Sequence, residues 1–414
     1  MADSWEEVFH KNRLVPPSSQ TVRLAVENHL TANHSFQLSF SRLIVAQLPQ
    51  DLSAGEDVTY QLRVTLFDRK LQHFFGKTWK SSSQKMKNNK ISFNEVLYLH
   101  TSLLLPSTLV VVELVSLSTK PDGSYLSLGR GFSILELFTN RPEGPGTNGD
   151  RRLNLHHGTP RGLLHPSLKD SVDYGNLLKV IDGAHLDCVM KTHPSLNSAV
   201  HLLPEHALVS GEDNIPGLIL SPAGDALLRP QLLKMTPFTL DKLTISLQPS
   251  LEKFESLLLQ LINADCQNTK QPEPEDAQRT VVIQERRLHV GVHNGWCFLD
   301  KPQVVVLEPA ASGVRGRTDS TSKKSTLVKE SSTTSSRPQM LGLRSSLEIK
   351  MANNQALAIV FQLEYVFSAP IGRETMVRET HMYYGISFKE FESKHFQCMV
   401  SAMAPKAPFT SELL

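Results

Sequence analysis

The stretch Val58-Thr59-Tyr60-Gln61-Leu62-Arg63-Val64-Thr65-Leu66 decides the fold. Large apolar residues alternate in it with polar ones, which is typical of a β-strand with one buried face and one solvated face. A second run opens at Ile91 and continues through Phe93, Leu97 and Leu99. A slip of one residue in register would turn every buried side chain outward, so these patterns specify strands strongly.

The same alternation continues on both sides of this pair. Phe36, Leu38 and Phe40 precede it, and the β-branched run Leu109–Val115 follows it. Several short strands with turns between them and little helix predict a β-sandwich over residues 36–140. Residues 1–35 are expected to form a separate N-terminal segment with one short helix that begins at a capping box.

The remainder of the chain divides by composition. Residues 141–152 are rich in proline and glycine, which predicts a linker. Residues 153–370 predict a second β-rich domain with one amphipathic helix, capped by Ser250 and running to Ile262. Within that domain residues 310–340 are rich in serine, threonine, lysine and arginine and are expected to be a disordered loop. Residues 371–414 show no clear period and are expected to form a poorly ordered tail.

Composition excludes several classes of protein. The 414 residues carry a formal net charge of +2, which argues against a general nucleic-acid binder. The four cysteines are scattered without a CxxC pair, which indicates reduced thiols rather than a disulfide framework. No apolar run reaches the roughly 18 residues that cross a bilayer, and the acidic start has no secretory signal. A cytoplasmic location is therefore expected.

Catalytic and metal-binding motifs are absent from the sequence. It holds no P-loop, no GxSxG elbow and no HExxH helix. The adjacent His156 and His157 would point to opposite sides of an extended segment and would not chelate one ion. We predict no enzyme activity, no catalytic residue, no cofactor and no metal site.

A basic stretch from Arg69 to Lys90 is the main candidate for a binding site. It contains no acidic residue, and aromatic residues are interleaved with its cations. We expect the lysines over one sheet face as a patch for anionic lipid or a partner, and each would attract lipid headgroups by about 1 kcal/mol. The alternative is a solvated loop that protects an edge strand from aggregation. The candidate residues are Arg69, Lys70, Lys77, Trp79, Lys80, Lys85, Lys87 and Lys90.

The order of strand patterns in residues 36–140 resembles a C2 domain. Phe93-Asn94-Glu95 is similar to the central strand of that family, and Leu109–Val115 to the strand after it. The loops corresponding to the calcium site offer only Asp68 and Asp122. Calcium takes six to eight oxygen ligands, so the resemblance implies a C2-like sandwich that does not bind calcium.

Longer motifs resemble the nephrocystin-4 family, in order from about Trp5 to Gly372. They are His73-Phe74-Phe75-Gly76-Lys77-Thr78-Trp79-Lys80, His157-Gly158-Thr159-Pro160-Arg161, His201-Leu202-Leu203-Pro204-Glu205, Pro249-Ser250-Leu251-Glu252-Lys253-Phe254-Glu255, Val292-His293-Asn294-Gly295 and Phe361-Gln362-Leu363-Glu364-Tyr365-Val366-Phe367. The resemblance implies a non-enzymatic scaffold of the ciliary transition zone, basal body, centrosome and cell junctions. It further implies control of access to the cilium, restraint of Hippo signalling, and nephrocystin-1 and an RPGR-interacting-protein-like scaffold as partners.

Two departures from the family and one alternative function accompany this interpretation. The chain is several times shorter than family members, and we expect its tail to diverge from about Arg373, as in a truncated or isoform-like chain. The alternative is a calcium-independent C2-type module that binds an anionic membrane through Arg69–Lys90. Ser320 and Ser325 are predicted phosphorylation sites in the serine-rich loop, because phosphate would reverse the local charge.

Overall fold

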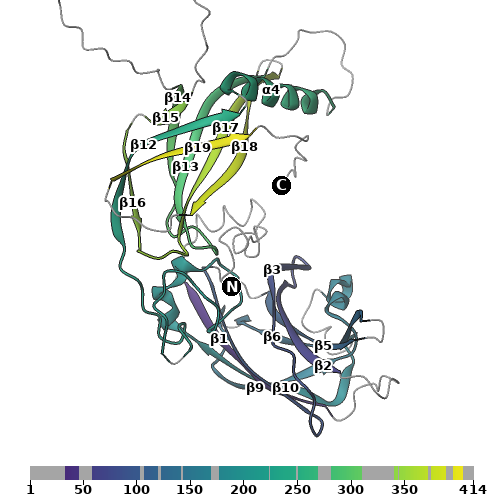
Figure 1. Cartoon of the computed structure of the whole chain (residues 1–414). Coiled ribbons are helices and arrows are strands. Elements are labelled where there is room, and N and C mark those ends of the chain that lie inside the picture. The colour runs from purple at the N-terminus through teal and green to yellow at the C-terminus, as the bar shows by residue number, and fades with distance from the viewer. Residues whose placement is uncertain are drawn as a thin grey trace, which may run out of the picture. The chain divides into compact units, whose positions relative to one another are not determined.

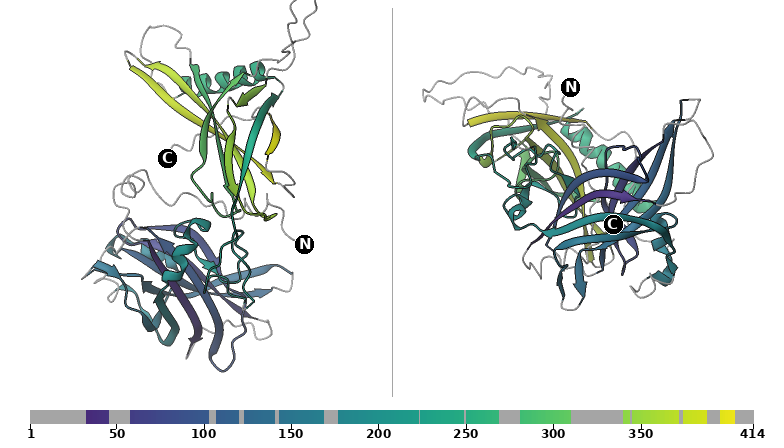
Figure 2. Two further views of the ribbon diagram at one scale, coloured as in Figure 1. Left: turned by 90° about the vertical axis from the view of Figure 1, so that its left-hand side faces the viewer. Right: turned by 90° about the horizontal axis from the view of Figure 1, so that it is seen from below.

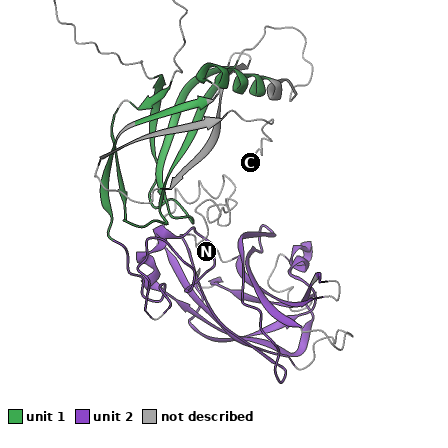
Figure 3. Cartoon of the chain, viewed as in Figure 1, with its two compact units in different colours: residues 1–7, 234–414 green, residues 8–233 purple. Residues whose placement is uncertain are grey.

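A computed structural model of the chain separates it into two compact units, coloured in Figure 3. Unit 2 holds residues 8–233 and unit 1 holds residues 234–414 together with residues 1–7. The structure describes residues 33–45, 58–102, 107–119, 123–140, 143–168, 177–222, 224–248, 250–268, 281–309, 340–343, 345–371, 374–387 and 395–403. The expected N-terminal helix, nearly all of the serine-rich loop, Asp122, Ser320 and Ser325 lie outside these residues.

Unit 2 is a sandwich made by one long sheet that doubles back on itself (Figure 1 and, from two other sides, Figure 2). One layer has the order β11-β4-β1-β10-β9 and the other has the order β6-β5-β2-β3. A single residue pairing between Phe132 and His156 joins the two layers at the β6–β9 edge. The strands are β1 (His34–Ile44), β2 (Thr59–Asp68), β3 (His73–Lys80), β4 (Lys90–Thr101), β5 (Thr108–Thr119), β6 (Tyr125–Glu136), β7 (Phe138–Asn140), β8 (Glu143–Pro145), β9 (Gly149–His156), β10 (Val180–Thr192) and β11 (Val209–Ser210).

The core of unit 2 lies between these layers and follows the period of two seen in the sequence. Phe36, Leu38 and Phe40 of β1 are fully buried and belong to the same cluster as Leu62 and Val64 of β2. A smaller cluster on the outer side of the β6-β5-β2-β3 layer is completed by Leu163, from the short 3-10 helix η1 (Pro160–Leu164). The expected β-sandwich is therefore confirmed.

The boundary of this sandwich differs from the expected one. Residues 141–152 do not form a linker: β8 pairs with β7, and β9 pairs with β10, which pairs with β1. The unit consequently runs to Leu233 instead of ending at residue 140. Glycine and proline at 141–150 mark tight turns between strands here, and composition alone does not distinguish such turns from a linker.

Unit 1 is built on a second sheet, with the order β16-β12-β15-β14-β13-β17-β18, and β19 pairs with β12. The β12–β19 pairing is parallel. A turn that contains Asn353 and Asn354 joins β16 to β17. The elements are β12 (Thr236–Gln248), α4 (Leu251–Asn268), β13 (Val282–His293), β14 (Gln303–Pro309), β15 (Leu341–Leu343), β16 (Leu347–Met351), β17 (Ala358–Ile371), β18 (Glu374–Ser387) and β19 (His395–Met403).

Helix α4 begins where the sequence predicts it and packs on this sheet. The Ser250 hydroxyl caps it by accepting a hydrogen bond from the Lys253 amide at 3.2 Å. Phe254 is fully buried on its apolar side, and its ring stacks on that of Tyr365 from β17, with centroids 6.2 Å apart. The mainly β fold class with one amphipathic helix is confirmed.

The tail differs from the expectation of poor order. Residues 374–387 form β18 along the whole length of β17, and residues 395–403 form β19 beside β12. Period-two alternation is weak in both segments, so the sequence pattern did not predict these strands.

Candidate functional site: a basic face on unit 2

The predicted basic stretch does not form one surface. Arg69 is only 7% exposed and its guanidinium lies 3.5 Å from the Glu136 carboxylate, so it is part of the interior. Trp79 packs its ring against the main core, and Lys77 beside it in β3 is half-buried. The expectation of one continuous lysine surface is therefore wrong for these residues, because β3 turns its aromatic side chains inward.

The exposed lysines of the stretch lie on opposite sides of the sandwich. Lys80 pairs with Arg63 of β2, in the β6-β5-β2-β3 layer. Lys90 pairs with Ile44 of β1, in the other layer. Lys70 follows β2 in the same layer as Lys80. Only the end of the stretch, from Lys85 onward, leads to the β4-β1-β10-β9 layer.

A tight turn fixes the last two lysines. Asn88 and Asn89 both have positive φ, 49° and 59°, which is the backbone of a type I′ turn and is tolerated best by asparagine and glycine. The Lys87 amide donates to the Lys90 carbonyl at 2.8 Å and the Lys90 amide to the Lys87 carbonyl at 3.0 Å. Directly opposed residues place their side chains on the same side, so both lysines project together.

Strand register then brings in cations from distant parts of the sequence. In one row across the sheet Lys90 of β4 is opposite Ile44 of β1, which is opposite His185 of β10. In the next row Arg42 of β1 is opposite Asp187 of β10, which is opposite Arg152 of β9. Inward positions alternate with these and are buried, so the two rows form the outer side of the layer.

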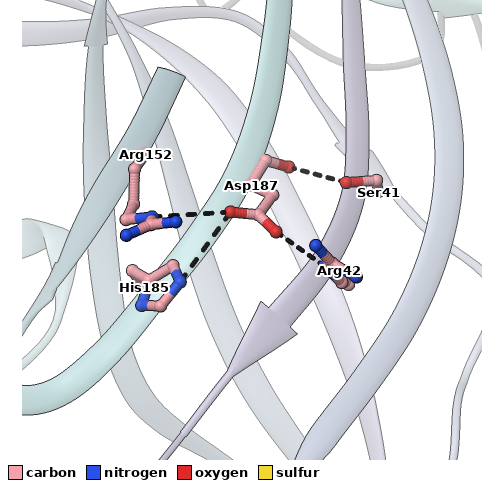
Figure 4. Close-up of polar contacts among 5 residues, drawn as sticks. All are labelled: Ser41, Arg42, Arg152, His185 and Asp187. Carbon is pink, nitrogen blue, oxygen red and sulfur yellow. Dashed lines mark hydrogen bonds and ion pairs between the residues drawn. The ribbon is translucent and has the colours of Figure 1, made fainter. Parts of the chain in front are cut away.

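Asp187 is the centre of this outer surface, as Figure 4 shows. Its Oδ2 accepts a hydrogen bond from Arg42 Nε at 2.7 Å, and its Oδ1 lies 3.9 Å from Arg152 Nε and 3.8 Å from His185 Nε2. Its backbone carbonyl accepts a hydrogen bond from the Ser41 hydroxyl at 3.3 Å. Ser41 is the extra residue where the β1 register shifts, and this bulge turns Arg42 outward.

We call Lys87, Lys90, Arg42 and Arg152 the basic face. Asp187 lies among them, and Asp150, two residues before Arg152, is a second carboxylate on the same side of β9. Four cations against two carboxylates leave a net positive surface. Arg42 and Arg152 escaped sequence analysis because they lie in separate strands; only the long-range pairing of β1, β10 and β9 unites them.

The same side of the layer is covered at its other end by the chain itself. Tyr98 of β4 points outward yet is fully buried, because His193 packs against its ring and Asp225 against its hydroxyl. Its hydroxyl donates to Asp225 Oδ2 at 2.7 Å and accepts from Gln37 Nε2 at 3.0 Å. Burial and the Asp225 carboxylate both raise the pKa of Tyr98, so the hydroxyl stays protonated.

Two buried histidines fasten this cover. His100 Nε2 lies 3.0 Å from the Leu203 carbonyl, and His206 Nε2 lies 2.8 Å from the Thr101 hydroxyl. Burial lowers the pKa of both imidazoles, and the Glu205 carboxylate partly opposes that effect. Both are therefore neutral near pH 7, and this contact holds the structure together rather than performing chemistry.

Metal and calcium sites find no support among the described residues. Asp68 is buried and its Oδ1 accepts hydrogen bonds from the amides of Lys70 and Leu71, so it closes a turn. His156 packs its ring against Phe132. In the described part of the chain no three His, Cys, Asp or Glu side chains gather around a common point suited to an ion.

Comparison with known proteins identifies the family. A sequence model described as "Nephrocystin-4 second C2-like domain" matches residues 236–405. This match continues past Arg373. The expected divergence of the tail from about Arg373 stays a prediction. Nephrocystin-4 of Xenopus laevis is 39% identical over 381 residues, which cover 89% of this chain and 26% of that protein. Nephrocystin-4 of Homo sapiens is 43% identical over 378 residues, with the same coverage.

Solved structures are similar only at a distance. The C2A domain of plant Extended Synaptotagmin 1 is aligned with 38% of this chain and 93% of its own, at 16% identity and a TM-score of 0.23. Human GIVD cytosolic phospholipase A2 is aligned with 86% of this chain and 29% of its own, at 8% identity and a TM-score of 0.23. Scores this low carry no argument about activity. The sequence relatives are much more similar. Over most of its length the chain is a homologue of nephrocystin-4, and it spans about a quarter (26%) of the curated relatives it matches.

Proposed function

We propose that the chain acts as a non-enzymatic scaffold or adaptor at the ciliary transition zone and basal body. The observation that carries this proposal is the identity of about two residues in five with nephrocystin-4 over 89% of the chain. Support for cilium assembly, control of access to the cilium, and links to junctions and Hippo signalling belong to the same proposal. Because the chain spans 26% of its relatives, we assign to it one part of the scaffold and only some of the partners.

Two features of the molecule support binding rather than catalysis. The polar groups at the best-developed clusters either fasten segments, as His100 and His206 do, or face solvent on a sheet surface, as Arg42 and Arg152 do. No described helix is long and apolar enough to span a bilayer. Nephrocystin-1 and an RPGR-interacting-protein-like scaffold are proposed partners of the whole protein.

Proximity labelling in ciliated epithelial cells tests this function. The full chain fused to a biotin ligase should label transition-zone and basal-body proteins above a ligase-only control. A second fusion lacking residues 1–233 assigns the labelling to one unit. Cutting at residue 140 instead would leave β9 and β10 without β1, so it would test misfolding. Labelling no different from the ligase alone would reject the proposal.

A further inference from the structure

We propose that the basic face of unit 2 is a docking site for an acidic segment of a partner protein. The inference rests on the proposed scaffold function and names the class of partner that this surface takes. Lys87 and Lys90 from one turn, Arg42 from β1 and Arg152 from β9 supply the charge, from three separate pieces of the fold. Charge complementarity is the basis for choosing an acidic occupant.

The arrangement of Lys87 and Lys90 lowers the stability of the folded chain. Lys87 and Lys90 are directly opposed across a turn, and like charges in that position repel. The turn gives no relief, because Val45 donates its amide to the Asn89 carbonyl at 3.0 Å and holds the tip against the end of β1. Both side chains are exposed. A bound carboxylate between them would convert this repulsion into attraction.

Asp187 orients the two arginines without removing them from solvent. Arg42 and Arg152 remain 57% and 72% exposed, while Asp187 is 22% exposed between them. Each guanidinium uses Nε toward the aspartate, and its planar fork matches a carboxylate. The two arginine backbones are two strand spacings apart, about 10 Å. Two carboxylates of one extended chain, about 7 Å apart at alternate residues, reach both side chains.

The covered end of the layer, beside the basic face, favours a protein segment over a membrane as the occupant. The segments that carry His193 and Asp225 cover Tyr98 on this same side of the layer, so the surface has a step, with the basic face on its lower level. A flat bilayer would meet the raised cover first and would be held away from the cations nearest the step. A single extended chain is narrow enough to lie on the lower level. The step therefore favours an acidic protein segment.

The test titrates the full chain into a fluorescein-labelled peptide of alternating glutamate and serine, followed by anisotropy. Arg42→Glu with Arg152→Glu should weaken binding by at least about tenfold. The matched control is Lys70→Glu with Lys80→Glu, an equal charge change on the other layer, which should change binding by less than about twofold. Arg42→Gln with Arg152→Gln, which adds no carboxylate beside Asp187, should weaken binding as well. Thermal melts check that all variants fold.

Each other outcome overturns the inference. Equal loss in the basic-face and control variants would mean non-specific charge attraction, and absence of peptide binding would mean no site. A parallel arm uses vesicles that contain phosphatidylserine and a phosphoinositide. Vesicle binding that is lost in the Arg42 and Arg152 variants, with no peptide binding, would assign the face to a membrane. The peptide and vesicle measurements test the basic face alone. Proximity labelling at the cilium tests the proposed function, and either test can fail without the other.

Discussion

An arginine–carboxylate cluster from the described part of unit 1 can be compared with one from unit 2, and the two clusters serve different ends. In unit 1 Arg286 of β13 makes a bidentate pair with Glu255 of α4, at 2.5 and 2.8 Å. The Tyr365 hydroxyl donates to the same carboxylate at 3.1 Å. In unit 2 Arg42 and Arg152 flank Asp187 and stay largely in solvent. The first cluster fastens a helix to a sheet, and the second presents charge to the outside.

Exposure separates these two roles. Arg286 and Glu255 are 24% and 14% exposed, so loss of either partner leaves a charge with little water around it. The arginines of unit 2 keep their hydration, and an ion pair of that kind contributes little to folding. Similar residue types therefore predict a stability defect in one unit and a binding defect in the other.

The largest effect is expected from the core beneath α4. Phe254→Ala removes a fully buried ring that stacks on Tyr365, and should lower the free energy of unfolding by about 3–5 kcal/mol. Urea denaturation followed by Trp296 fluorescence measures it in unit 1. Leu257→Ala, at an exposed position of the same helix, is the control. Similar midpoints for the two variants would mean that α4 does not stabilise the sheet.

Acidification should weaken unit 1 through His293. Burial lowers the pKa of this imidazole to about 4, whereas the unfolded chain binds the proton near pH 6.5. Stability is therefore full above about pH 6.5 and falls as the pH decreases toward 4, by about 3 kcal/mol in total. His293→Asn keeps an acceptor, its Oδ1 in place of Nδ1, for the Gly295 amide and should flatten this dependence in urea midpoints from pH 7 to pH 4.5. An unchanged slope would contradict the assignment.

Breaking the half-buried ion pair gives the next largest effect. Arg286→Ala strands Glu255 and Tyr365 and should cost about 2–3 kcal/mol, below the range for a fully buried pair because both partners keep some solvent. Replacing Arg286 and Glu255 together with methionine and leucine should cost less than Arg286→Ala alone. The comparison between single and double variants isolates the unpaired charge. If the double variant were the less stable one, the pair itself would be the stabilising element.

The smallest effect is expected in unit 2. Arg152→Ala removes a 72% exposed side chain whose Nε is 3.9 Å from Asp187, and should change unfolding by no more than about 0.5 kcal/mol. Chemical denaturation at low and at high salt measures it. A decrease of about 2 kcal/mol or more in the free energy of unfolding would exceed what exposed ion pairs contribute. It would mean that the Asp187 cluster stabilises the fold and does not differ in role from the Glu255 cluster.

Local pattern predicted most of the strands in this fold. The alternation at Val58–Leu66 became β2, the apolar run at Leu109–Val115 became β5, and the stripe after Ser250 became α4. β2 and α4 bury one face each, so their hydrophobic period agrees with the structure. β5 buries both faces, which is why its sequence is a continuous apolar run. The error at residues 141–152 arose where the chain turns sharply between strands, because turns and linkers use the same residues.

The candidate site was predicted only in part, for a different reason. Lys87 and Lys90 stood out as part of a charge run, but Arg42, Arg152 and Asp187 occupy ordinary outward positions of three strands. A single outward arginine is normal on a solvated strand. Arg42 pairs with Asp187, 145 positions away, and Asp187 pairs with Arg152 of a third strand; sequence period encodes neither pairing.

The parallel pairing of β12 with β19 has a consequence for biosynthesis. β12 is the first strand of unit 1 and β19 is its last, so one long edge of the sheet waits for residues 395–403. A nascent chain passing through the ribosome must hold β12 without this neighbour while the intervening strands emerge. Chaperones that shield unpaired strand edges should therefore act on this unit late in synthesis, and a premature stop codon before His395 would release a chain prone to aggregate.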